Sequence, residues 1–127
     1  MNIEEYREYC LSIKGATESF PFGENTLVYK IMDKMFTFAP LNPKDGRFWA
    51  DTKCDSTKST ELIELYNGIA FGPFSDKKHW ITIYLESDVP DSLIKELINH
   101  SIEEVIKKLS KKKQQEYRST LGIKDEN

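Results

Sequence analysis

Cysteine, histidine and glycine are scarce in this sequence, and it has no long apolar run. The 127 residues include two cysteines, two histidines and six glycines. Cys10 and Cys54 form no C-x-x-C motif and have no histidine at metal-ligand spacing, so the sequence predicts neither a metal site nor a redox site. No apolar run approaches the roughly 18 residues that a membrane-spanning helix needs, and acidic residues stand near the N-terminus where a signal peptide has cations. We therefore expect a cytoplasmic protein with reduced cysteines and no membrane partner.

Common enzyme signatures are absent from the sequence as well. It contains no G-x-G-x-x-G, G-x-x-x-x-G-K, G-x-S-x-G or H-E-x-x-H motif. His79 and His100 have no close ligand set for a metal ion, and His100 is interpreted as a capping or packing residue. We therefore predict that the chain is no enzyme and that it uses no cofactor and no metal. A deep pocket lined by His79 or His100 with a neighbouring carboxylate would instead favour an enzyme or a small-ligand binder.

The residues that are present fit one folded domain over residues 1–127. Leucine, isoleucine, valine and phenylalanine number 32, about a quarter of the chain, which exceeds the level of disordered sequences. The formal net charge is −3, so the surface as a whole is not expected to attract phosphate. Residues 107–118 nevertheless hold six cations and one anion, which makes a basic C-terminal tail from about residue 110. This tail either serves a polyanion or is a solvated helix end whose lysines complement the helix dipole.

Apolar spacing predicts a helix at the start of the chain. Residues 3–13 carry apolar side chains at intervals of three and four, which places one apolar stripe on a helix and buries Cys10. Asn2 and Glu5 match a capping box at the beginning of this helix. Gly15 is expected to end it.

Aromatic and β-branched segments predict the strands. Residues 27–32 and 35–39 are separated by Asp33-Lys34, so a hairpin is expected there. Asp33-Lys34 is a poor type I′ turn because lysine tolerates positive φ badly, which leaves a different loop length open. Asp55 is expected to cap a helix that ends near Tyr66. Further strands are predicted at residues 47–53, 69–71 and 80–85.

The last helical pattern begins at Pro90 and carries a second capping signal in its middle. Ser101 and Glu104 form a capping-box pattern, which predicts that the chain restarts there as two helices or a kinked one. Beyond Ser110 the polar tail either continues as helix or frays. The order of elements predicts an α+β fold with a single antiparallel sheet and helices packed on one face.

Residues 77–80 form the cluster most relevant to binding. Lys77, Lys78 and His79 stand directly before a strand that begins with Trp80. In one interpretation the lysines neutralise phosphate while His79 or Trp80 contacts sugar or base. In the other, Trp80 anchors the sheet against a helix and the lysines keep a loop solvated.

Five short segments resemble the MmcQ/YjbR family of small bacterial proteins. They are Phe20-Pro21-Phe22-Gly23 with residues 24–30, Lys34-Met35-Phe36, Lys53-Cys54-Asp55, Lys77-Lys78-His79-Trp80 and Asp88-Val89-Pro90-Asp91. Together they cover about residues 1–110 in the order and spacing of that family. The resemblance implies a twisted antiparallel sheet backed by helices, similar to the bacterial frataxin-like CyaY architecture. The chain departs from the family pattern at Ser75-Asp76, at Ile81 and at Asp33-Lys34.

The same resemblance implies contact with nucleic acid, because members of the family are commonly labelled DNA-binding. The positions that match recurring family residues are Lys53, Lys77, Lys78, His79 and Trp80. To these we add the basic tail, with Lys111, Lys112 and Lys113. The leading hypothesis is therefore weak, sequence-nonspecific binding of double-stranded DNA through a lysine-rich patch.

A non-enzymatic protein-interaction or regulatory module is the alternative hypothesis. Its partner would be an acidic protein that engages the basic tail or a face of the sheet. Solvent-exposed aromatic side chains on the sheet would favour this alternative. The candidates are Phe48, Trp49, Phe71 and Phe74.

Overall fold

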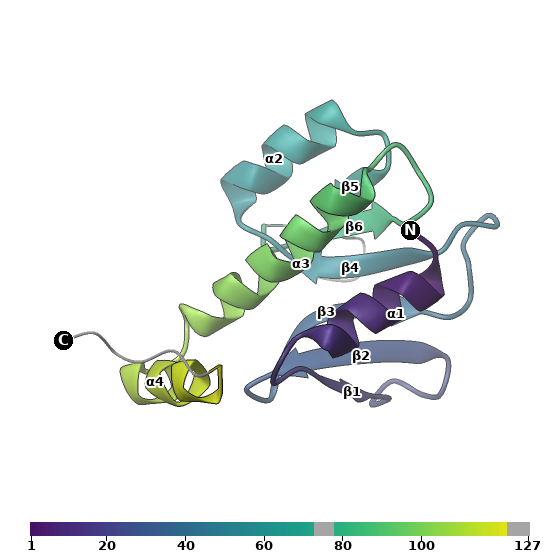
Figure 1. Ribbon diagram of the computed structural model, residues 1–127. Coiled ribbons are helices and arrows are strands. Elements are labelled where there is room, and N and C mark those ends of the chain that lie inside the picture. The colour runs from purple at the N-terminus through teal and green to yellow at the C-terminus, as the bar shows by residue number, and fades with distance from the viewer. Residues whose placement is uncertain (73–77, 122–127) are drawn as a thin grey trace.

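The computed structural model describes residues 1–72 and 78–121, and within them six strands form one antiparallel sheet in the order β1-β2-β3-β4-β6-β5. The strands are β1 (Thr17–Ser19), β2 (Thr26–Ile31), β3 (Lys34–Pro40), β4 (Trp49–Lys53), β5 (Ile69–Phe71) and β6 (Trp80–Tyr84). The helices are α1 (Ile3–Ser12), α2 (Ser56–Leu65), α3 (Asp91–Ile106) and α4 (Lys111–Thr120). Helices α1 and α3 lie over one face of the sheet, α2 lies beside β5 and β6, and α4 lies beyond one end of the strands (Figure 1). The predicted α+β fold is confirmed.

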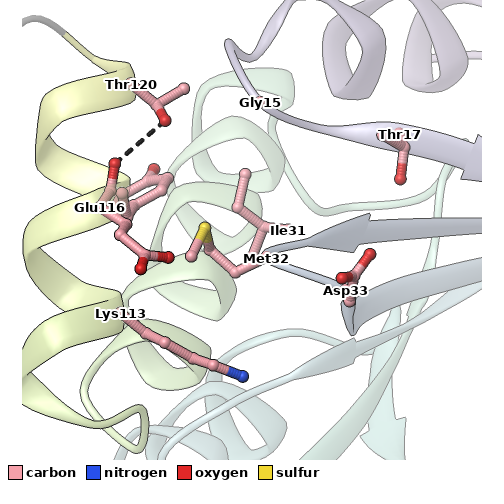
Figure 2. A pocket seen from close by; sticks show the side chains of 9 residues that line it. Gly15, Thr17, Ile31, Met32, Asp33, Lys113, Glu116 and Thr120 are labelled. Carbon is pink, nitrogen blue, oxygen red and sulfur yellow. Dashed lines mark hydrogen bonds between the residues drawn. The ribbon is translucent and has the colours of Figure 1, made fainter.

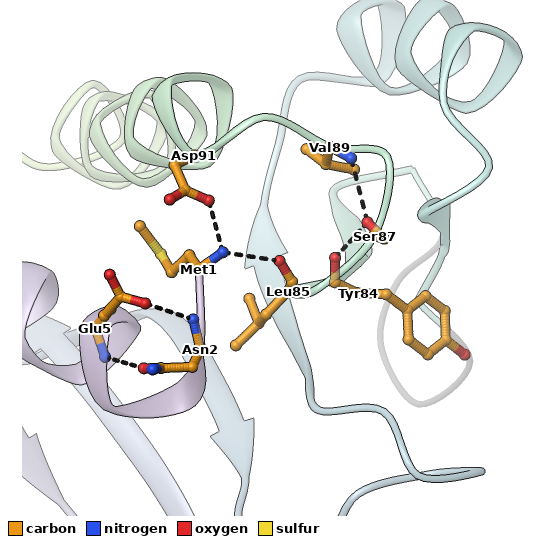
Figure 3. A network of polar contacts seen from close by, with 8 residues as sticks. All are labelled: Met1, Asn2, Glu5, Tyr84, Leu85, Ser87, Val89 and Asp91. Atoms are coloured by element: carbon orange, nitrogen blue, oxygen red, sulfur yellow. Dashed lines mark hydrogen bonds and ion pairs between the residues drawn. The ribbon is translucent and has the colours of Figure 1, made fainter.

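The N-terminal helix has the predicted cap. The side chain of Asn2 accepts a hydrogen bond from the backbone of Glu5, and the side chain of Glu5 accepts one from the backbone of Asn2. The α-amino group of Met1 also bonds to Asp91 at 2.6 Å, and it donates to the carbonyl oxygen of Leu85 at 3.4 Å (Figure 3). Because Asp91 is the first residue of α3, this ion pair joins the starts of the two helices that cover the sheet.

The β2–β3 hairpin turns one residue earlier than the sequence suggested. Met32 and Asp33 occupy the turn with φ of 49° and 63°, so Lys34 is already a strand residue. Positive φ at both central residues is the signature of a type I′ turn, whose twist matches that of the flanking strands. Lys34 therefore does not have to adopt the positive φ that is unfavourable for lysine. The pairing also shifts between Tyr29 and Lys30, where the ladder is irregular.

The predicted restart at Ser101 is wrong, because α3 runs without interruption through it. The hydroxyl of Ser101 is buried and donates to the carbonyl oxygen of Ile98 at 2.5 Å, within the same helix. The apolar stripe continues past this point through Ile102 and Val105, both packed in the core, so burial outweighs the capping pattern. The chain breaks instead after Ile106, and the side chain of Ser110 caps α4.

Strand β1 was not predicted. Its three residues, Thr-Glu-Ser, carry no apolar alternation, and pairing with the longer β2 holds them in the sheet. Glu18 lies at its centre and accepts hydrogen bonds from Arg7 of α1 and from the hydroxyl of Tyr29. The guanidinium of Arg7 is the main reason that the pKa of Glu18 is lowered. Polar contacts to Glu18 therefore hold β1 in the sheet, so this strand lacks the apolar alternation by which strands are recognised in a sequence.

The two faces of the sheet differ in what covers them. On the face under the helices, the buried hydroxyl of Tyr6 lies within hydrogen-bonding distance of the hydroxyls of Thr37 and Thr52. Strand alternation then places Phe38 and Asp51 on the opposite face, where α1 and α3 do not reach. None of the helices in the described segments has the length and apolar character to cross a bilayer.

Candidate nucleic-acid interface

One end of the sheet gathers residues that the sequence singled out from distant segments. Lys53, the last residue of β4, is paired with Trp80, the first residue of β6. The amide of Cys54 donates to the carbonyl oxygen of His79 at 2.8 Å, which brings Lys78 to the same end. Lys77 lies outside the described residues.

Three lysines from different elements lie close together at this end. Partial burial is the largest cause that lowers the pKa of Lys53, and the positive charges of Lys108 and Lys34 lower it further. Glu104 opposes this effect. Lys34, Lys53 and Lys108 are called the lysine cluster below. Because Lys34 of the hairpin and Lys108 after α3 both act on Lys53, positive charges from three segments lie near the end of β4.

Carboxylates are also present around the lysine cluster. Glu104 is largely buried and forms an ion pair with Lys107 at 2.5 Å, and it is the acidic group that acts on Lys53. Asp55 caps α2 with its side chain and so directs its charge toward backbone amides. The end of the sheet is therefore mixed in charge, with Lys34 and Lys108 exposed to solvent.

The three tail lysines lie in the first turn of α4. Lys111, Lys112 and Lys113 are exposed, and they follow the Ser110 cap directly. Cations at a helix N-terminus oppose the helix dipole, so this placement does not stabilise α4. The interpretation of the basic run as a complement of a helix C-terminal dipole therefore fails for these three lysines, which stand at the start of a separate helix. It holds for Lys107 at the end of α3 and for Arg118 in the last turn of α4.

A shallow cavity separates α4 from the β2–β3 hairpin. It has a volume of about 300 Å³ and lies between Lys113 and Tyr117 of α4 and Met32 of the hairpin turn. Figure 2 shows Lys113 extending beneath Met32 on the side of Asp33. Lys34 follows Asp33 directly, so the cavity places Lys113 of the tail beside the hairpin that carries Lys34. Asp33 and Glu116 supply carboxylates to the same cavity.

The interpretation of Trp80 as an anchor against a helix is wrong. Its ring lies 6.2 Å from that of Phe38, on the face of the sheet away from α1 and α3. Phe38 also contacts Phe22 and Trp49, at 6.3 Å and 6.2 Å between ring centroids. Four aromatic rings therefore lie together on this face, those of Phe22, Phe38, Trp49 and Trp80. Ile81, the next residue after Trp80, points the other way and is fully buried in the core.

The aromatic residues proposed for a protein interface differ in their exposure to solvent. Trp49 is 8% exposed and Phe48 is half-buried against the core, whereas Phe71 is 48% exposed. Phe74 lies outside the described residues. Phe20 and Phe22, which sequence reasoning did not propose for this role, are 46% and 65% exposed.

His100 has the packing role that the sequence suggested. Its Nε2 accepts a hydrogen bond from the backbone amide of Asp55 at 3.1 Å, just before α2 begins. Burial is the main cause that lowers the pKa of His100, so the neutral ring is favoured. This contact joins α3 to the start of α2.

Neither cysteine has the surroundings of a nucleophile. Cys10 and Cys54 are both buried free thiols, and burial raises the pKa of each. A reactive cysteine needs a lowered pKa and access to solvent. Among residues 1–72 and 78–121, no three side chains of histidine, cysteine, aspartate or glutamate are grouped to hold a metal ion.

Sequence reasoning missed Lys34 and Lys108 as members of the cluster. Lys34 stands between Asp33 and apolar residues, so charge patterning gives it no weight. Lys108 belongs to the basic run at residues 107–118, but its position near Lys53 depends on the tertiary structure. The hairpin offers the one usable signal for Lys34, because a tight turn brings the residue after it to the end of the sheet.

The YjbR family model matches residues 11–103 of the chain. An uncharacterised Escherichia coli O157:H7 protein named YbdF is 32% identical over 115 residues, covering 91% of this chain and 93% of that protein. The uncharacterised YjbR protein of Escherichia coli K12 is 26% identical over 113 residues, covering 89% of this chain and 94% of that protein.

Solved structures agree with these sequence matches. A Deinococcus radiodurans crystal structure with the family-model domain DUF419 has a TM-score of 0.80 and 30% identity, covering 99% of this chain and 91% of that one. A Pseudomonas syringae crystal structure at 20% identity shares the fold with a TM-score of 0.70, covering 80% of this chain and 96% of that one. The family model spans most of the chain, from the end of α1 to within α3, and the chain therefore belongs to the YjbR family.

Proposed function

We propose that this protein binds double-stranded DNA weakly and without sequence preference through the lysine cluster. The observation that carries the proposal is the convergence of Lys34, Lys53 and Lys108 from three elements onto one end of the sheet. Bringing like charges together costs free energy, and a phosphate backbone placed against them would relieve that repulsion. The exposed lysines at the start of α4, of which Lys113 lines the cavity beside the hairpin, would extend this surface.

The distribution of charge limits the expected affinity. The net charge of −3 provides no long-range attraction to DNA, so binding depends on local contacts and on low salt. If about five phosphates are neutralised, affinity falls by roughly two to three powers of ten between 50 and 200 mM salt. The carboxylates of Glu104 and Asp33 reduce the local field and favour the weak end of this range.

The test uses fluorescence anisotropy of a labelled duplex in a salt series. The double variant Lys34→Glu with Lys108→Glu changes two exposed cluster residues and should leave the core intact. Lys44→Glu with Lys95→Glu is the matched control, because both residues are exposed and it changes net charge equally away from the cluster. We expect the cluster variant to lose at least about tenfold in affinity and to show a smaller salt slope. The control pair should stay near the parent protein.

Three results would contradict the proposal. They are the absence of a duplex shift at low salt, a flat salt response, and an equal loss in the two double variants. Binding of polyglutamate by the parent protein, lost in the cluster variant while duplex DNA does not bind, would assign the same lysines to an acidic protein partner.

A further inference from the structure

A second concave site lies on the open face of the sheet. Its volume is about 460 Å³, within the range typical of small-molecule sites. It is lined by Trp49 of β4, by Thr82 and Tyr84 of β6 and by Ala70 and Phe71 of the edge strand β5. The segment 42–44 between β3 and β4 also lines it. This connection and the β2–β3 hairpin lie at opposite ends of β3, so the cavity is separate from the lysine cluster (Figure 1).

A tight turn pairs two cationic residues beside this cavity, Lys44, which lines it, and Arg47. The amide of Lys44 donates to the carbonyl oxygen of Arg47 and the amide of Arg47 donates to that of Lys44, both at 2.9 Å. Asp45 and Gly46 between them have φ of 52° and 75°, as a type I′ turn requires. Residues directly opposite in such a pair project to the same side, so Lys44 and Arg47 stand together.

Arg47 connects this cationic pair to Tyr84, one of the aromatic residues that line the cavity. Its guanidinium carbon lies 4.0 Å from the centroid of the Tyr84 ring, a stacked cation–π contact. Lys44 itself lines the cavity. Both side chains are exposed, so their charges remain accessible to a ligand.

The remaining polar groups near the cavity do not compete for an anion at this edge. The hydroxyl of Thr82 donates to Oδ1 of Asp51 at 2.6 Å, and this carboxylate is fully buried, so it is not exposed to a ligand in the cavity. Asp45 is exposed at the tip of the turn, outside the lining residues. Asn42 adds an amide that can donate or accept.

We propose that this cavity binds a small planar aromatic anion. Its ring would pack against Tyr84 and Phe71, whose side chains supply flat apolar surface, and its anionic group would lie between Lys44 and Arg47. A nucleoside monophosphate and an aromatic carboxylate share this chemistry. The site stands apart from the proposed DNA surface, so either proposal can fail without the other.

The test is a titration of the isotopically labelled full-length protein followed by ¹H–¹⁵N NMR. The probes are adenosine monophosphate with adenosine as its neutral match, and 2-naphthoate with 2-naphthol as its neutral match. We expect saturable shifts at residues 42–47, 70–71 and 82–84, with an anion bound at least about fivefold more tightly than its neutral match. Binding of the nucleotide or of the carboxylate alone would identify which class the site prefers.

Substitutions separate the anion contact from the aromatic contact. Lys44→Gln and Arg47→Gln should each weaken binding of the anion severalfold and leave the neutral match unchanged, while Lys95→Gln should change neither. Phe71→Ser should weaken both members of each pair.

Each remaining outcome of the titration overturns the proposal. No saturable shift up to about 10 mM of either anion would do so, since that concentration excludes even millimolar affinity. Equal affinity for neutral and anionic probes would show that the cations take no part. Shifts confined to residues near Lys34 and Lys108 would assign anion binding to the lysine cluster instead.

Discussion

Helices α3 and α4 are consecutive and differ in how the rest of the molecule holds them. Helix α3 buries seven of its residues, among them Leu97 and Ile98, against the sheet. Helix α4 buries none, and Tyr117 is its half-buried contact with the core. A helix that lies on the sheet continues through a capping signal at Ser101, whereas a peripheral one starts where its cap at Ser110 permits. In α3, packing against the sheet therefore outweighs the local capping signal. In α4, which has little packing, the local cap determines where the helix begins.

The largest expected effect on stability concerns α3, the helix that is buried against the sheet. Leu97→Ala removes a side chain that is 1% exposed and leaves a cavity between α3 and the sheet. We expect the free energy of unfolding to fall by about 2 to 5 kcal/mol, measured by urea denaturation. Tyr117→Ala in α4 is the matched comparison and should cost distinctly less. Equal losses from the two substitutions would show that α4 belongs to the cooperative core.

A smaller effect distinguishes the two serines that resemble caps. Ser110→Ala should destabilise α4 by about 1 kcal/mol, seen as faster hydrogen exchange of its amides, because the hydroxyl accepts from Lys113 at the helix start. Ser101→Ala should change the free energy of unfolding by less than about 0.5 kcal/mol, because alanine favours a helix interior. A larger loss from Ser101→Ala than from Ser110→Ala would reverse the comparison.

The smallest expected effect is a pH dependence of the free energy of unfolding that arises from His100 of α3. Burial lowers the pKa of His100 in the folded protein, while the unfolded chain keeps a value near 6.5. The unfolded state therefore takes up the proton first as pH falls, so stability should decline below about pH 6.5. Urea denaturation between pH 8 and 5.5 measures this decline. His100→Gln should flatten it, and an unchanged slope in that variant would assign the pH dependence to other groups.

The sequence predicted the elements whose signals are local. The Asn2 and Asp55 caps, the strand at residues 69–71 and the strong strand at residue 80 follow from residue type and spacing alone. The prediction failed at β1, whose polar residues are held by partners from α1 and β2, and at Ser101, where core packing decided. Both failures have the same origin, because the deciding contacts come from residues distant along the chain.

The candidate sites were less accessible to prediction than the fold. Adjacency in sequence identified Lys78, His79 and Trp80, and the family resemblance named Lys53, which the register of β4 with β6 places opposite Trp80. Lys34 and Lys108 joined because a tight turn and the end of α3 lie at the same end of the sheet. Arg47 and Tyr84 are far apart along the chain, and their stacked contact had no sequence signal.

By itself the sequence determined the fold class and the approximate position of most elements, because caps, turns and apolar spacing act within a few residues, and its short motifs indicated the family. Tertiary structure decided which charges share a field and which aromatic rings meet. Those relations depend on strand order and register, which bring side chains together across many intervening residues. They also depend on burial, which raises the free-energy cost of a charged group.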